Sequence, residues 1–272
     1  MKRAIDSSRD VVVTADLRAL LEDPSFGPAT RRAMRAAADR SVPSVNLKEA
    51  WDSAKAAHVA LLEGGAILLV LTGVPDIDPA GMTGFDGTWQ WKRAAESPPG
   101  TMELAFIPEA GSLFVLGDHT WVLGAGVAAQ RARAALQEAG GHPVGPQNTA
   151  QLELQRPLSM TVPAARMAVV ERRIRMRELR PTLDGITRLR ASATIGVGAT
   201  VVIDLDYDSE ESATRASSIW QEILRALGKR DGEPLAFLAA GKLARDGNRV
   251  HLEAPIPGDI LESLAGAEDR LF

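Results

Sequence analysis

The sequence predicts an α+β fold with two antiparallel-sheet domains, each with helices packed on one face of its sheet. The length of 272 residues suits two domains of roughly 130 residues each. Short strand-like runs bounded by Gly and Pro alternate with fewer helical segments, and the Gly- and Pro-rich segment GGHPVGPQNTA divides the chain near its middle. We therefore expect an N-terminal domain over 1–140, a linker over 141–150 and a C-terminal domain over 151–272.

The first part of the N-terminal domain is expected to hold one strand and three helices. Val11–Val13 begins an extended strand, and Asp16 is placed to cap a short helix at Leu17–Glu22. Helical patterns then cover Ala29–Arg40 and Leu47–Glu63.

The helix expected at Leu47–Glu63 depends on a spacing. Trp51, Ala54, His58 and Leu61 fall at positions i, i+3, i+7 and i+10, which lie on one helical face. The glycine pair that follows Glu63 is expected to end this helix.

Strands dominate the remainder of this domain, because short apolar runs are separated by Gly- and Pro-rich loops. The expected strands are Ala66–Thr72, Thr88–Arg93, Met102–Ile107, Leu113–Leu116 and Thr120–Leu123. The last two flank Gly117-Asp118-His119, which has the composition of a hairpin turn, and a helix at Val127–Ala139 closes the domain.

The C-terminal domain has the order β-α-β-β-α-β followed by elements of a hairpin, which predicts a ferredoxin-like arrangement with an added hairpin. Ser209 is expected to cap the second helix, with Glu210 and Glu211 favourable against its dipole. The expected elements are strand Leu152–Val162, helix Ala164–Leu179, strands Ile186–Ile195 and Ala199–Tyr207, helix Ser209–Leu227, strands Lys242–Arg245 and Arg249–Ala254, and a last helix Gly258–Ala265.

Composition argues against several classes of function. The absence of cysteine excludes thiolate catalysis, disulfides, zinc fingers and iron–sulfur clusters. A net charge of −4 and a pI near 5.7 argue against a nucleic-acid partner.

The longest apolar run, Gly64–Val74, is about half of the roughly 20 residues that span a bilayer, so we expect a buried strand and no transmembrane segment. No apolar region follows the basic residues Lys2 and Arg3, so no signal peptide is expected.

The sharpest motif is Gly124-Ala-Gly126-Val-Ala-Ala129, a G-x-G-x-x-A pattern that opens a helix. Glycines in this pattern let a backbone approach a pyrophosphate at a helix N-terminus. Here the preceding strand belongs to a hairpin instead of a βαβ series. Tight helix–strand packing is therefore the favoured interpretation, and nucleotide binding at Gly124 and Gly126 is the alternative.

A second candidate is an acidic strand end. Asp204, Asp206 and Asp208 alternate along the strand, so they project from one face and would suit Ca²⁺ or Mg²⁺. Ser209 stands where an EF-hand loop needs Gly, and Arg215 stands where it needs its bidentate Glu. A polar strand edge that leads into a capped helix is the favoured interpretation, and we expect no metal and no other cofactor.

Two further groups are candidate binding surfaces. The arginines between 166 and 190, with Arg172, Arg173 and Arg177 at the centre, form the largest charge asymmetry in the chain. They would suit a phosphate-rich partner, an anionic membrane surface or an acidic protein, although pairing with the acidic stretch 204–211 is favoured. Trp89 and Trp91 share one face of a strand, where core packing is favoured over an exposed aromatic patch.

Three segments resemble uncharacterised bacterial envelope proteins of lipoprotein type with tandem ferredoxin-like α+β units. They are VVVTADLRALLEDPSFGPATRRA, FIPEAGSLFVLGDHTWVLGAGVAAQRARAAL and GNRVHLEAPIPGDILESL. The resemblance implies an envelope location and a binding role, and it implies no catalytic residues. The chain departs from that group because it has no cysteine to carry a lipid anchor.

The leading hypothesis is therefore a non-catalytic binding or structural protein of the bacterial envelope. It would face the periplasm if a native signal has been removed, and would otherwise be cytoplasmic. Its partner is expected to be another protein or an envelope component. The alternative is a cytoplasmic nucleotide- or small-ligand-binding protein or enzyme that uses the Gly124–Ala129 turn.

Overall fold

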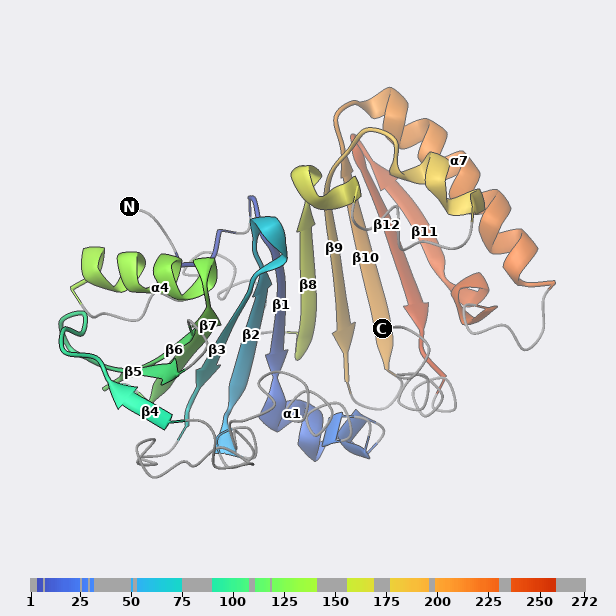
Figure 1. The fold of residues 1–272 in the computed structure, drawn as a ribbon. Helices are drawn as coiled ribbons and strands as arrows, with labels where there is room; N and C mark the ends of the chain where they lie inside the picture. Colours follow the sequence, from blue (N-terminus) through green and yellow to red (C-terminus); the bar gives the residue numbers. More distant parts are fainter. Residues whose placement is uncertain are drawn as a thin grey trace. The chain divides into compact units, whose positions relative to one another are not determined.

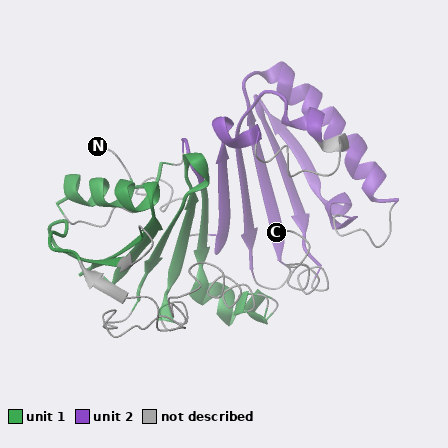
Figure 2. Cartoon of the chain, in the orientation of Figure 1, with its two compact units in different colours: residues 1–6, 12–155 green, residues 7–11, 156–272 purple. Residues whose placement is uncertain are grey.

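The computed structural model describes residues 4–6, 8–24, 26–28, 30–31, 50, 53–74, 90–107, 111–117, 119–140, 156–168, 177–195, 199–229 and 236–257. The chain divides into two compact units, of which unit 1 holds residues 1–6 and 12–155 and unit 2 holds residues 7–11 and 156–272 (Figure 2). Each unit combines an antiparallel sheet with few helices (Figure 1), which confirms the predicted α+β class.

The sheet of unit 1 has the spatial order β1-β2-β3-β7-β6-β5-β4. From β2 to β4 each neighbouring pair is antiparallel. The strands are β1 (Val11–Asp16), β2 (Ala56–Leu61), β3 (Ile67–Thr72), β4 (Gln90–Arg93), β5 (Thr101–Ile107), β6 (Gly111–Leu116) and β7 (Thr120–Ala125). The helical elements are α1 (Leu17–Glu22), the 3₁₀ turn η1 (Glu63–Gly65) and α4 (Val127–Glu138).

Helix α1 begins where the sequence predicted. The side chain of Asp16 accepts a hydrogen bond from the backbone N–H of Ala19 at 2.9 Å, which satisfies one of the free donors of the first turn. Leu17 and Leu20 are buried, so the cap fixes the direction in which the helix leaves β1.

The sheet of unit 1 is covered on both faces, which corrects the prediction of helices on one face. Leu69 and Leu71 of β3 pack with Leu17 of α1 in one cluster. Leu68 and Val70 of the same strand belong to a second cluster, with Ala and Leu side chains of α4. Because alternate residues of a strand point to opposite faces, these two clusters lie on the two sides of the sheet.

The helix predicted at Leu47–Glu63 is wrong over its second half. Ala56–Leu61 forms β2, which pairs with β3 along its whole length, from Ala56 opposite Thr72 to Leu61 opposite Ile67. The glycine pair ends no helix, because it lies in the turn η1 between the two strands. Helix propensity favours this alanine-rich segment, but pairing and burial on both faces override it.

Unit 2 has the sheet order β11-β12-β10-β9-β8, again antiparallel throughout. Its strands are β8 (Leu158–Pro163), β9 (Ile186–Thr194), β10 (Thr200–Tyr207), β11 (Lys242–Asp246) and β12 (Arg249–Pro255). Its helical elements are the 3₁₀ segments η3 (Ala164–Arg166), η4 (Arg177–Leu183) and η5 (Ala236–Ala240), and helix α7 (Glu210–Leu227).

These pairings differ from the predicted ferredoxin-like arrangement. In a split βαβ unit another strand lies between the first two strands, whereas β8 pairs directly with β9, with Leu158 opposite Ala193. The strands β8, β9 and β10 therefore form a meander, and β12 follows β10. The continuous helix predicted at Ala164–Leu179 is replaced, in its described part, by a short helical turn that opens with η3 and by the start of η4.

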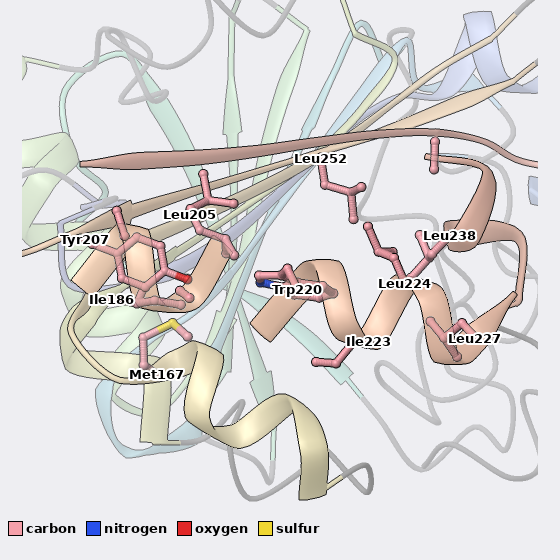
Figure 3. Close-up of a cluster of buried hydrophobic side chains, with 14 of the residues drawn as sticks. Met167, Ile186, Leu205, Tyr207, Trp220, Ile223, Leu224, Leu227, Leu238 and Leu252 are labelled. Carbon is pink, nitrogen blue, oxygen red and sulfur yellow. The ribbon is translucent and has the colours of Figure 1, made fainter. Parts of the chain in front are cut away.

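Helix α7 covers one face of this sheet, and Figure 3 shows the core beneath it. The predicted cap is confirmed, because Ser209 Oγ accepts a hydrogen bond from the N–H of Ser212 at 3.1 Å. Trp220 of the helix packs with Leu252 of β12 and with Tyr207 of β10. The single tyrosine is 1% exposed and donates a 2.7 Å hydrogen bond to the carbonyl of Thr182, and burial raises its pKa.

Several predicted segments lie outside the described residues: the linker over 141–150, most of the helix at Ala29–Arg40, and the last helix at Gly258–Ala265.

Gly124 lies where β7 passes beneath α4. A Cβ atom at this position would lie 3.0 Å from both the Cβ of Ala128 and the backbone nitrogen of Ala129. The glycine therefore allows close packing of helix and strand, which is the interpretation that the sequence favoured. Gly126 has a φ of 54°, in the region that favours glycine, and it caps the helix without a side chain.

We predict that Gly124→Ala lowers the free energy of unfolding by about 1–3 kcal/mol, because the added methyl group overpacks the interface of β7 and α4. Urea denaturation measures this. The matched control is Gly117→Ala, whose methyl group would meet no atom within 4 Å and should change stability by less than about 0.5 kcal/mol. Equal effects would contradict the packing role.

Candidate functional site: the charged face of unit 2

The sequence-predicted binding residues are only partly described. Trp89, Arg172 and Arg173 lie outside the described residues. Trp91 lies in β4 and Arg177 in η4, and only their backbone is described. The binding role of these five residues remains a prediction.

The acidic strand end lies on the face of unit 2 opposite α7. Along β10, Leu205 and Tyr207 point into the core, so Asp204 and Asp206 point to the other face. The register places His251 of β12 and Arg190 of β9 on the two sides of Asp204. We call the side chains of Arg188, Arg190, Asp204, Asp206, Arg249 and His251 the charged face.

Asp206 is the centre of this face. Its Oδ1 accepts a 2.6 Å hydrogen bond from Nε of Arg249, and its Oδ2 accepts one of 3.1 Å from Nη2 of Arg190. The Asp206 side chain is 18% exposed, against 35% for Arg190 and 49% for Arg249. The hydrogen bond with Asp206 raises the pKa of Arg249. Because the pairs are half-buried, solvent screens them less than it screens fully exposed pairs.

Asp204 has its own partner. Its Oδ1 lies 2.8 Å from Nδ1 of His251, and the two side chains are 20% and 36% exposed. A carboxylate at Nδ1 is the arrangement that orients a catalytic histidine. In the described part of the chain, however, no hydroxyl makes a hydrogen bond with His251, so the pair is not part of a nucleophilic triad there.

The carboxylates of the acidic strand end do not converge. Asp206 faces two arginines and Asp204 faces His251. Asp208 accepts a 3.1 Å hydrogen bond from Ser209 Oγ at the start of α7. Among the described residues, no group of three or more histidine and carboxylate side chains is placed to hold a metal ion. One of the expected internal pairs, Arg190 with Asp206, is present.

Sequence reasoning missed a second charged site, which lies in unit 1. Glu103 of β5 is 0% exposed, and its Oε1 accepts hydrogen bonds from Ser112 Oγ at 2.8 Å and from the guanidinium group of Arg133. Its Oε2 has no hydrogen-bond partner among the described residues. Arg133 belongs to α4 and its side chain is 41% exposed, so the pair joins the helix to the buried carboxylate of the sheet. A lone Glu in an apolar strand was the available signal.

We predict that Arg133→Met lowers the free energy of unfolding by about 3 kcal/mol, because it leaves a carboxylate buried without its cation. Chemical denaturation checks this against Gln130→Met, the same replacement at an exposed position of α4, which should cost less than about 0.5 kcal/mol. A similar loss in both variants would show that the ion pair does not stabilise unit 1.

Nδ1 of His58 in β2 lies 3.1 Å from Oγ1 of Thr14 in β1. Burial lowers the pKa of His58 from 6.5. As the pH falls below 6.5, the unfolded chain therefore takes up a proton at this residue before the folded chain does. This difference destabilises the native state at acidic pH and has no effect above the unfolded pKa.

We predict that the loss of stability between about pH 7.5 and about pH 5 is smaller in His58→Gln than in the parent protein. Urea denaturation at both pH values measures the difference. An unchanged or larger acid-dependent loss in the variant would contradict the neutral, buried state of His58.

None of the helices in the described part of the chain has both the length and the apolar character needed to span a bilayer.

Comparison with known proteins identifies a shared fold. No protein-family model matches the chain, and no match was found among curated proteins. The chain is similar to TP0453 in two crystal structures, of forms I and IV, each with a TM-score of 0.57 over 97% of this chain. The aligned regions cover 95% and 94% of the TP0453 chains at 12% identity. At this identity the likeness concerns the fold alone.

Proposed function

We propose that the protein is a non-catalytic binding protein of the bacterial cell envelope, that it faces the periplasm, and that it holds its partner through the charged face of unit 2. The observation that carries the binding role is the arrangement around Asp206. A carboxylate that is 18% exposed orders two guanidinium groups on the surface opposite the core. Ordered side chains lose less conformational entropy when a partner binds.

The same arrangement favours binding over catalysis. The charge of Asp206 is neutralised by Arg190 and Arg249 within the face, and Asp204 is hydrogen-bonded to His251, so neither carboxylate is free to act on a substrate. A mixed pattern of ordered charges serves specificity and steering toward a complementary partner.

The envelope location rests on the resemblance of residues 11–33, 106–136 and 247–264 to envelope proteins. The partner is another protein or an envelope component. The rival use of Gly124 as a nucleotide contact is less favoured, because Ala128 and Ala129 occupy the space that the absent side chain leaves.

The proposal predicts a contact at the charged face in native cells. A photoreactive residue placed at Glu253, which lies on the same side of β12 as His251 and is exposed, should give a light-dependent adduct in the periplasmic fraction. Reversal of the charges of Arg190 and Arg249 to Glu in the same chain should abolish the adduct. The matched control carries the photoreactive residue at Arg215, on the exposed side of α7, and should give none.

Three outcomes would contradict the proposal. They are recovery of the protein from the cytoplasm after release of the periplasm, an adduct that survives the charge reversal, and thermal stabilisation by nucleotides that Gly124→Ala removes.

A further inference from the structure

The strand β11 (Lys242–Asp246) ends the sheet of unit 2 (Figure 1), since it pairs with β12 on one side and with no described strand on the other. The N–H of Tyr207 donates a 2.9 Å hydrogen bond to the carbonyl of Asn248, one step beyond the last register pair of β10 and β12. Because the backbone groups of successive strand residues point to alternate sides, the odd-numbered residues of β12 face β11. Their partners in β11 are the even-numbered residues. Leu243 and Arg245 therefore direct their N–H and C=O groups to the open edge.

The side chains of β11 divide between the two faces of the sheet. Leu243 packs against the core beneath α7, and Arg245 donates a 2.9 Å hydrogen bond to Glu210 of α7. The charge of Arg245 is thus paired within the chain. The opposite face carries the exposed side chains of the other three residues, Lys242, Ala244 and Asp246. In the part of the chain that the structure describes, the lysine and the aspartate of this set form no salt bridge and no side-chain hydrogen bond.

The sequence of this strand is complementary to itself when two copies run antiparallel about Ala244. Lys242 of each copy then lies opposite Asp246 of the other copy. Leu243 of each copy lies opposite Arg245 of the other, and these are the residues whose backbone groups face the edge, so each such pair can exchange two hydrogen bonds. A shift of this register by two residues would leave both charges without a charged residue opposite.

We propose that β11 is an interface between two copies of this chain, which pair edge to edge about a two-fold axis at Ala244. Charged residues on an edge strand normally discourage pairing with other strands, but a second copy of this strand supplies the opposite charge at both positions. The register then extends across four strands as an alternating row: Glu253 and Lys242 of one copy, then Asp246 and Arg249 of the other. Every neighbour in this row has the opposite charge.

The inference goes beyond the proposed function, because it concerns association of the chain with itself and needs no ligand of the charged face. Residues that lie opposite each other in an antiparallel pair project from the same face of a sheet. The charged faces of the two copies would therefore lie on the same side of the joined sheet, where one partner could contact both.

Disulfide trapping tests the register, because the parent chain has no cysteine. The two copies of residue 244 form a pair without mutual hydrogen bonds, whose Cα atoms lie about 4.5 Å apart, within the range that a disulfide bridges. We expect diamide to convert Ala244→Cys to a covalent dimer. Lys242→Cys lies on the same face of the same strand, but its two copies would be about 13 Å apart along the strand. It should therefore stay monomeric, as should Arg215→Cys on α7.

Charge exchange tests the complementarity by sedimentation at rising protein concentration. Lys242→Glu and Asp246→Lys should each weaken self-association about tenfold or more, because like charges then meet twice across the axis. An equal mixture of these two variants should recover it, because each charge again meets its opposite. Arg215→Glu makes the same change of net charge as Lys242→Glu on an exposed site of α7 and should associate as the parent protein does. Circular dichroism verifies that the variants remain folded.

Three results would overturn the β11 interface. They are cross-linking of Ala244→Cys no faster than that of Arg215→Cys, cross-linking of Lys242→Cys as fast as that of Ala244→Cys, and no recovery of association in the mixture of charge variants. None of them bears on the partner of the charged face, which the photoreactive residue at Glu253 tests by the mass of its adduct.

Discussion

The alternation of side chains along β10 determines the character of unit 2. Leu205 and Tyr207 point under α7, and the tyrosine is fixed there by its hydrogen bond to the carbonyl of Thr182. Asp204 and Asp206 must then project from the opposite face, because neighbouring strand residues point to opposite sides. The apolar core and the charged face are thus two results of one strand register, and a slip by one residue would exchange them.

Two carboxylates, Glu103 of unit 1 and Asp206 of unit 2, have different physical roles. Glu103 of unit 1 is 0% exposed and joins α4 to the sheet through Arg133, so this carboxylate stabilises the fold. Asp206 of unit 2 is 18% exposed and orders two arginines whose side chains are 35% and 49% exposed. Burial decides between these roles, because a fully buried carboxylate cannot reach a binding partner without unfolding.

Local signals in the sequence predicted most strands, the caps at Asp16 and Ser209, and the acidic strand end. The helix assigned to Ala56–Leu61 was wrong because β2 is buried on both faces, so it shows no clean alternation of apolar and polar residues. Only one of the two arginine partners of Asp206 could be predicted from the sequence. Arg190 follows from a meander of neighbouring strands, whereas the contact of Arg249 depends on the pairing of β12 with β10, which are separated by a helix and another strand.

The central claim is that Asp206 holds the guanidinium groups of Arg190 and Arg249 in place. Proton exchange at the N–H groups that contact Asp206, Nε of Arg249 and Nη2 of Arg190, followed by NMR and compared with the matching groups of exposed arginines, measures this directly. Slower exchange at Arg190 and Arg249 than at Arg215 and Arg225 of α7, with the difference removed by Asp206→Asn, is the result that this structure predicts. Equal exchange at all four arginines in the parent protein would contradict an ordered charged face.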